Sequence, residues 1–210
     1  MLERLAHAAA PGRRRSPLGP GDTGVPRGDH DLNPDFYDPR RPLTAAAVLV
    51  PIVTHPSGLT VLFTRRTEHL DAHAGQISFP GGRIEPGDEG PAAAALRETE
   101  EEIGIPRQDV RLIGSLDTYV TRTGFEVTPV IGLIRPPLRL TLDAFEVAEA
   151  FETPLEFFLA PGNLQRHSRT FEGRDRHFHV YPYGDYFIWG ATAGMLVNLA
   201  EVLGGTGKGA

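Results

Sequence analysis

The sequence predicts an α/β fold in which helices cover the faces of a mixed β-sheet. Two apolar runs, residues 43–53 and 59–66, flank the turn sequence "HPSG" and read as a hairpin of buried strands. A helix is expected from Pro91, a residue favoured in the first helical turn, to the stop at Gly104. Residues 188–204 have the periodicity of a closing amphipathic helix.

The remaining elements follow in chain order. Residues 76–88 are expected to form a strand and a glycine-rich loop, and further strands, a short helix and a second hairpin are predicted at 109–121, 125–134, 154–160, 169–173 and 177–183. Residues 1–42 contain seven prolines and seven arginines, which is typical of an extension with little core of its own. We therefore expect an extension over 1–42, one folded domain over 43–203 and a flexible tail over 204–210.

Composition narrows the function classes. The formal net charge of −6 argues against nucleic acid or an anionic membrane as the main partner. The absence of cysteine excludes disulfides, zinc–thiolate sites, iron–sulfur clusters and thiol nucleophiles. No apolar run reaches the roughly 20 residues of a membrane-spanning helix, and no secretory signal is visible. We expect a cytoplasmic protein; the oligomeric state is left open.

The stretch "LRETEEEIG", residues 96–104, places four acidic residues near the end of the predicted helix, and no cation follows closely. Glu98, Glu101 and Glu102 have the i, i+3, i+4 spacing that puts their side chains on one face, with Arg97 at its edge. Two carboxylates ~5 Å apart repel by about 3 kcal/mol at an effective dielectric near 20. The end of a helix also disfavours negative charge. A recessed cluster would need a cation, and carboxylates alone favour Mg²⁺ or Mn²⁺. The alternative is a solvated acidic face.

Residues 97–105 resemble the second half of the Nudix box, Arg-Glu-aliphatic-any-Glu-Glu-any-Gly-aliphatic, with Thr99 at an aliphatic position. Counting back places Glu89 at the early glutamate of the box, but six residues rather than five then separate it from Gly82, and Asp88 competes for the role. The resemblance implies an α/β/α sandwich and a hydrolase of nucleoside diphosphate derivatives that uses Mg²⁺ or Mn²⁺.

The resemblance also assigns roles. It makes Glu98, Glu101 and Glu102 the metal ligands and Arg97 the residue that orients a glutamate by ion pairing. Nudix enzymes often bring an additional acid from outside the box. In the stretch "AFEVAEAFETPL" the candidates are Glu146 and Glu149, as general base or extra ligand, with solvated glutamates on a helix as the alternative.

A second stretch, residues 62–82, is similar to the motif that precedes the box in coenzyme A pyrophosphatases. Thr67 and Asp71 depart from it, and Asp71 stands where the motif has an arginine suited to a phosphate. The matching residues are Thr64, Arg66, Gly75, Phe79, Pro80, Gly81 and Gly82. The resemblance implies cleavage of coenzyme A or acyl-CoA to 3′,5′-ADP and 4′-phosphopantetheine.

Several of these residues have two readings. Gly81 and Gly82 would let the loop approach the metal site closely. Arg66, and with less support Arg65, could contact phosphate or protect a sheet edge. Phe79 could stack on substrate, although a core position is commoner. We expect His167, His177 and His179 to be structural.

Two other functions remain open. One is a Nudix hydrolase of ADP-ribose, NADH or a dinucleoside polyphosphate, which Asp71 favours. The other is a nucleotide-sensing protein that keeps the fold without turnover. Against the second, Arg97, Glu98, Glu101 and Glu102 are all present.

Overall fold

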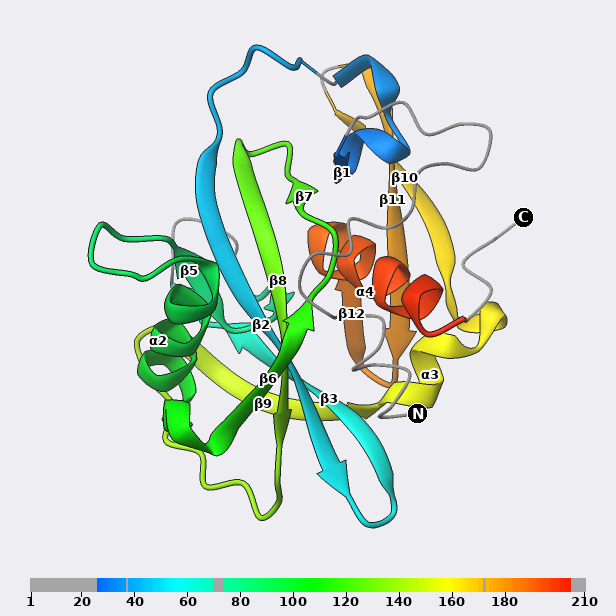
Figure 1. Ribbon diagram of the computed structural model, residues 1–210. Coiled ribbons are helices and arrows are strands. Elements are labelled where there is room, and N and C mark those ends of the chain that lie inside the picture. Colours follow the sequence, from blue (N-terminus) through cyan, green and yellow to red (C-terminus); the bar gives the residue numbers. More distant parts are fainter. Residues whose placement is uncertain (1–25, 37, 70–73, 172, 205–210) are drawn as a thin grey trace.

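The structure is a computed structural model that describes residues 26–36, 38–69, 74–171 and 173–204. Its main sheet runs in the order β1-β7-β8-β2-β3-β4, with β5 on β2, β6 on β8 and β9 on β3 (Figure 1). Strands β2 and β8 are parallel, as are β1 and β7, and the other pairs are antiparallel. The strands of this mixed sheet are β1 (Arg27–Gly28), β2 (Thr44–His55), β3 (Gly58–Arg66), β4 (Ile77–Ser78), β5 (Gly81–Arg83), β6 (Val110–Ser115), β7 (Tyr119–Val120), β8 (Phe125–Ile134) and β9 (Val147–Pro154).

Side chains of β2 alternate between two cores, one on each face of the sheet. Ala47, Leu49 and Val53 pack on one face with residues of helix α2 (Pro91–Ile103). Val50 and Ile52 pack on the other face. There they meet helices α3 (Leu155–Leu159) and α4 (Gly190–Val202). In Figure 1, α2 lies on one side of the sheet and α4 on the other. The predicted α/β/α arrangement with a mixed sheet is confirmed.

A second, three-stranded sheet lies beside α4 (Figure 1). It contains β10 (Gln165–Phe171), β11 (Arg174–Tyr183) and β12 (Tyr186–Trp189) in sequence order. The predicted second hairpin is therefore present, but the expected start of the closing helix is wrong, because Ile188 and Trp189 belong to β12. Helix α4 is also not amphipathic: residues 192–200 are all buried, because the helix lies between the main sheet and the second sheet.

The segment from Arg27 to Phe36 packs against the domain. Strand β1 pairs in parallel with β7, and the 3-10 helices Asp29–Asp31 and Pro34–Phe36 follow it. Asn33 bonds both the amide and the carbonyl of His177, at 2.9 and 2.8 Å. Arg27 forms a 2.8 Å ion pair with Glu201 on α4. This segment therefore joins the main sheet to α4 and the second sheet. The predicted tail, residues 204–210, lies outside the described part of the chain except for Gly204.

The stretch around Glu146 and Glu149 is not a helix. Strand β9 pairs along its length with β3, so that Glu149 faces Arg65 across the strands. Glu146 lies just before β9, in the loop that reaches Thr67. The alternative of two glutamates on a solvated helix is wrong, because pairing with β3 determines this segment.

No helix in the described ranges has the length and apolarity to span a bilayer. The remaining short elements are the 3-10 helices Arg107–Asp109 and Pro161–Asn163.

Candidate active site

Two adjacent glycines bring the backbone of β5 between β2 and α2. Gly81 pairs with Val48, and a Cβ at Gly81 would lie 2.3 Å from the carbonyl oxygen of Ala47. A Cβ at Gly82 would lie 2.4 Å from Oε1 of Glu98. At Gly81, where φ is +154°, the contact is with backbone and excludes any side chain, whereas at Gly82 a side chain would force the Glu98 carboxylate to move.

Helix α2 begins at Pro91, and Gly104 stops it just after Ile103, as predicted. Gly104 adopts the left-handed conformation, with φ of 72°, and its amide bonds the carbonyl of Glu100. Thr99 is fully buried, which explains why it occupies an aliphatic position of the box. Its hydroxyl donates to the carbonyl of Ala95 at 2.6 Å and is therefore satisfied within the helix.

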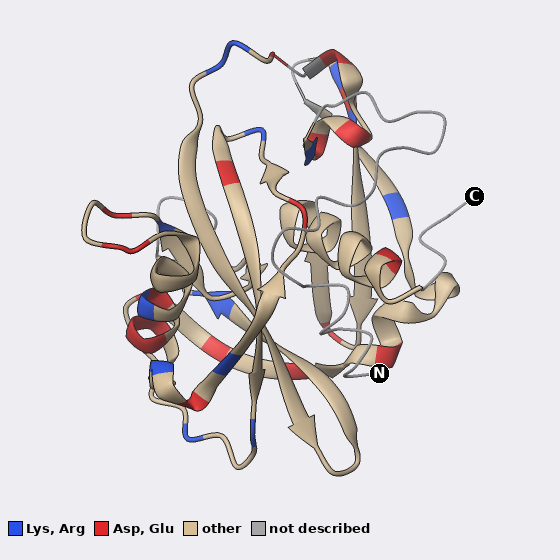
Figure 2. Cartoon of the chain, viewed as in Figure 1, with Lys and Arg blue, Asp and Glu red and all other residues tan. Residues whose placement is uncertain are grey.

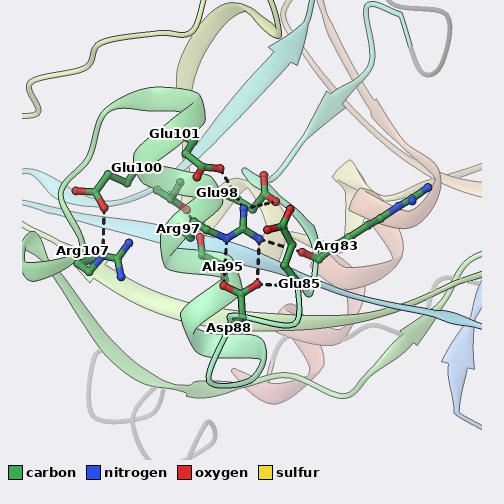
Figure 3. A network of polar contacts seen from close by, with 10 residues as sticks. Arg83, Glu85, Asp88, Ala95, Arg97, Glu98, Glu100, Glu101 and Arg107 are labelled. Atoms are coloured by element: carbon green, nitrogen blue, oxygen red, sulfur yellow. Dashed lines mark hydrogen bonds and ion pairs between the residues drawn. The ribbon is translucent and has the colours of Figure 1, made fainter.

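Arg97 is the centre of the polar network on α2 (Figure 3). Its Nη1 donates to Glu98 at 2.9 Å and to Glu101 at 3.0 Å. Its Nε and Nη2 donate to the two carboxylate oxygens of Asp88, at 3.1 and 3.0 Å, and Nη2 also bonds the carbonyl of Arg83. These bonds hold the pKa of Asp88 below its usual range. Asp88, rather than Glu89, is the early acid that contacts the helix.

The fourth acid of this stretch is neutralised separately. Glu100 points away from the site and pairs with Arg107 at 3.1 Å (Figure 3). The expectation that no cation follows the acidic stretch was therefore wrong: Arg107 lies just beyond the helix and folds back on it. Acidic positions nevertheless gather on α2 and on the loop before it (Figure 2).

Glu102 is the most buried acid of the site, with 6% of its surface exposed. Burial raises the pKa of its carboxyl to about 8, and repulsion from Glu98 and Glu146 adds to the shift. Arg66 and a hydrogen bond from the Gly81 amide act in the opposite direction. Burial also raises the pKa of Glu98. Two neighbouring carboxyl groups whose charged forms are disfavoured make a site that a bound cation would stabilise.

Glu146 reaches this cluster from outside the box. Its Oε2 lies 3.6 Å from Nη2 of Arg66, and its charge raises the pKa of both Glu98 and Glu102. Thr67 fixes the loop that carries it, because the Thr67 amide donates to the carbonyl of Glu146 and the Thr67 hydroxyl to that of Phe145, at 3.0 and 2.8 Å. Thr67, which departs from the motif of coenzyme A pyrophosphatases, therefore has a structural role in this loop.

The candidate ligands are all carboxylates, which suits a divalent cation that prefers oxygen ligands, such as Mg²⁺ or Mn²⁺. Its carboxylates come from one face of α2 and from the loop before β9. Among the residues that the structure describes, no three acidic or histidine side chains already converge as a complete cage. Glu98 and Glu101 instead contact Arg97, and the Glu101 side chain is 59% exposed. A cation would therefore compete with Arg97 for these two carboxylates.

Other residues proposed from the sequence lie elsewhere. Phe79 is buried and stacks on Phe63 at 5.2 Å between ring centroids, which favours its core reading, although it also borders a cavity. Arg65 pairs with Glu149 at 2.9 Å, and Glu149 also accepts a bond from Tyr186, so this acid is engaged away from the cluster. Asp71 lies outside the described residues.

The three histidines lie on the second sheet. His167 contacts Gln165 at 2.8 Å, and the backbone of His177 is bonded by Asn33. His179 is partly buried, and burial lowers the pKa of its imidazole, as does the neighbouring Arg166. None of them contacts the acidic cluster.

A cavity of about 1070 Å³ adjoins the acidic cluster at Gly81 and Arg66. It continues between the main sheet, α4, the N-terminal segment and the second sheet. Sequence reasoning missed its wall on the second sheet. The sequence signal for this wall was the high density of arginine and histidine over residues 166–179. From the sequence, we interpreted the histidines there but not the arginines.

Comparison with known proteins decides the family. The profile of the NUDIX domain matches residues 43–177. The chain belongs to the Nudix family. The Nudix hydrolase NudL of Escherichia coli K12 is 43% identical over 160 residues, covering 76% of this chain and 82% of that protein. NudL of Photorhabdus laumondii is 41% identical over 156 residues, covering 74% and 83%.

Structural similarity is weaker. An Ap4A hydrolase of C. elegans aligns with a TM-score of 0.46 and 23% identity over 53% of this chain and 80% of that one, a likeness that says nothing about substrate. Nudix hydrolases generally use divalent metal ions and act on small nucleotide derivatives. With relatives at this level of identity, the present Nudix protein is a hydrolase that acts on pyrophosphate bonds.

Proposed function

We propose that this Nudix hydrolase cleaves coenzyme A or acyl-CoA to 3′,5′-ADP and 4′-phosphopantetheine, with Mg²⁺ or Mn²⁺. The observation that carries the proposal is the joint placement of two motifs. The stretch over 62–82 that is similar to coenzyme A pyrophosphatases supplies Arg66 and Gly81, and both lie beside Glu102 of the box helix. The adjoining cavity is at the upper end of the usual range for ligand sites, which suits a long substrate.

The metal would be held by Glu98, Glu101 and Glu102. When bound, a divalent ion offsets the charge of the diphosphate and acidifies water. Arg97 orients Glu98 and Glu101, and Asp88 fixes Arg97. If a cation displaced Arg97 from Glu98 or Glu101, the Arg97 guanidinium would still be held by Asp88. The metal ligands could therefore be released while Arg97 keeps its position.

Glu146 is the proposed general base. In the reaction, a water oxygen forms a bond to one phosphorus, the bridging P–O bond breaks, and the water proton passes to the Glu146 carboxylate. Arg66, 3.6 Å from Glu146, is placed to contact a phosphate oxygen. Gly82 keeps the loop close to Glu98. The number of metal ions is not assigned.

Product analysis tests this proposal. The full-length protein should release 4′-phosphopantetheine and 3′,5′-ADP from coenzyme A with Mg²⁺ or Mn²⁺, and Glu102→Gln should slow the release about 100-fold or more. If coenzyme A is left intact while ADP-ribose or NADH is cleaved, the substrate assignment falls and the Nudix hydrolase assignment stands. Asp71 is the residue that favours this second outcome.

A purely nucleotide-sensing role has less support, because Arg97, Glu98, Glu101 and Glu102 are all present and Arg97 contacts two of the glutamates. We also propose a cytoplasmic location, because a chain without cysteine has no disulfides that would need an oxidising compartment.

A further inference from the structure

The loop before β9, residues 141–146, holds Glu146 beside the acidic cluster with little help from packing. Residues 143–145 are all exposed. Phe145 is 64% exposed although it is large and apolar, and its ring contacts that of His69 at 4.9 Å between centroids. Burial therefore contributes little to the position of this loop, and hydrogen bonds must fix it.

One end of the loop is attached to the C-terminal end of α2. The Asp143 amide donates to the carbonyl of Glu102 at 2.9 Å, and the Thr141 amide donates to that of Ile103 at 3.0 Å. The last carbonyls of a helix have no partner inside it, so these bonds satisfy them. A Cβ at Gly104 would lie 2.8 Å from Cβ of Thr141. The glycine that stops α2 therefore also lets the loop approach the end of the helix.

Asp143 also closes the turn that presents Glu146. Its carbonyl accepts bonds from the amides of Glu146 and Val147, at 3.0 and 2.8 Å. Its side-chain Oδ1 accepts a bond from the amide of Phe145 at 2.9 Å, the contact by which aspartate and asparagine favour turns. Asp143 thus bonds the backbone of Glu102 on one side and that of Glu146 on the other. One residue links a proposed metal ligand to the proposed base.

A second attachment, at Thr67, holds the other side of the loop. Thr67 follows β3 and donates to the carbonyls of Phe145 and Glu146. It ties the loop to the strand that carries Arg66, whereas Asp143 ties it to the helix that carries the proposed metal ligands. The separation of base and ligands therefore depends on Asp143. Stability of the turn alone would not require this connection to the helix.

We propose that Asp143 is a positioning residue for the reaction: its side-chain bond to the Phe145 amide sets where the Glu146 carboxylate lies relative to Glu102. The inference rests on the proposed function for the role of Glu146 as general base, but not for the identity of the substrate. Asp143 acts through Glu146 rather than on the substrate. A misplacement of about 1 Å can slow a reaction about 100-fold, so a loosened turn should be visible in kcat.

Steady-state kinetics of the full-length protein with Mg²⁺ test the proposal, with coenzyme A as substrate, or ADP-ribose if coenzyme A is not cleaved. Asp143→Ala should lower kcat about tenfold or more while KM stays within about twofold, because the base moves and the substrate contacts do not. Asp143→Asn keeps the acceptor oxygen and should recover most of the lost activity.

Asp109→Ala is the control, because it removes another exposed carboxylate that follows α2. Its kinetics should match those of wild type. A kcat within about twofold of wild type in Asp143→Ala would overturn the proposal. Equal losses in Asp143→Ala and Asp143→Asn would also overturn it, because the acceptor oxygen would then not be the cause.

Amide hydrogen exchange tests the same bond without turnover. The Phe145 amide should exchange about fivefold faster or more in Asp143→Ala than in wild type, because it loses its acceptor. Asp143→Ser is a second variant, whose hydroxyl is a weaker turn acceptor, and it should lie between the Asn and Ala variants in both kcat and exchange rate. Exchange at the wild-type rate in Asp143→Ala would contradict the proposed bond.

The positioning role and the base assignment fail differently. If Glu146→Gln lowers kcat and Asp143→Ala does not, the role of Asp143 is wrong and the base assignment stands. If Glu146→Gln keeps the wild-type kcat, the base assignment falls, and the role of Asp143 falls with it. The double variant Asp143→Ala/Glu146→Gln should have the kcat of Glu146→Gln alone. A further fall by the factor seen for Asp143→Ala would overturn the proposal, because Asp143 would then not act through Glu146.

Discussion

Arg97 holds both carboxylate oxygens of Asp88, through Nε at 3.1 Å and Nη2 at 3.0 Å. Only 7% of the Asp88 side chain is exposed, so this contact is shielded from water. It fixes the guanidinium whose remaining nitrogen orients Glu98 and Glu101. Asp88 therefore acts on the proposed metal ligands through Arg97.

Replacing Asp88 should disturb these ligands without unfolding the protein. We expect Asp88→Ala to lower kcat/KM by about 10- to 100-fold, the range found for residues that orient metal ligands. Glu89→Ala is the control, because Glu89 is exposed and next in sequence. Steady-state kinetics check both variants, and similar losses in the two would contradict the role of Asp88.

Gly82→Ala tests the approach of the loop to Glu98. The added Cβ would lie 2.4 Å from Oε1 of Glu98, so the carboxylate must move away. We expect at least about a tenfold rise in the Mg²⁺ concentration needed for half-maximal activity. Gly87→Ala is matched to it, because a Cβ there meets nothing within 4 Å. Wild-type Mg²⁺ dependence in Gly82→Ala would show that this approach is unimportant.

Glu102 should make the stability of the metal-free protein depend on pH. Its pKa is raised from 4.5 to about 8 in the folded state, so the folded protein binds more protons than the unfolded chain between these values. The free energy of unfolding attributable to Glu102 therefore falls as pH rises through this window. Glu102→Gln should remove this decline and raise Tm at pH 8 relative to wild type, with little change near pH 4.5.

Thermal unfolding in chelator checks this expectation, with Glu100→Gln as the exposed control. Mg²⁺ binds the deprotonated carboxylate, so its addition at pH 8 should raise the Tm of wild type more than that of Glu102→Gln. Turnover of the variant should fall about 100-fold or more. A wild-type Tm profile in Glu102→Gln would mean that this carboxyl is not forced to hold its proton.

Thr67→Val tests whether the loop before β9 positions Glu146. The substitution keeps the shape and removes the hydroxyl that donates to Phe145, at a cost of about 1 kcal/mol in stability. If Glu146 is the base, kcat should fall while KM for the nucleotide stays within about twofold. The double variant Thr67→Val/Glu146→Gln should have the same kcat as Glu146→Gln. If Thr67→Val lowers kcat by the same factor in the Glu146→Gln background as in wild type, Thr67 does not act through Glu146.

Local signals in the sequence predicted some elements well. Proline and glycine mark the ends of α2, and the alternation along β2 reflects its two cores. The closing helix was placed too early because its first residues are as apolar as the strand before it, and only pairing with β11 separates Trp189 from α4.

The site was predictable where it lies on one helix. The spacing of Glu98, Glu101 and Glu102 predicted their shared face, but two of the charges that act on Glu102, those of Arg66 and Glu146, come from residues far from it in the sequence. Arg66 lies on β3. The sequence allowed a helix around Glu146, and only the pairing of β9 with β3 shows that the segment is a loop followed by a strand. Asp88 and Glu89 differ by one position in a loop, and spacing could not decide which one Arg97 contacts.

Asn33 and Arg27 attach the N-terminal segment to His177 and Glu201, which lie far along the chain. A shortened protein starting at Leu43 would keep the whole stretch that matches the NUDIX profile. It would nevertheless lack one wall of the cavity of about 1070 Å³ and expose the surfaces of β7 and α4 that this segment covers. Homology boundaries are thus a poor guide to the minimal active fragment, and expression should begin no later than Pro26.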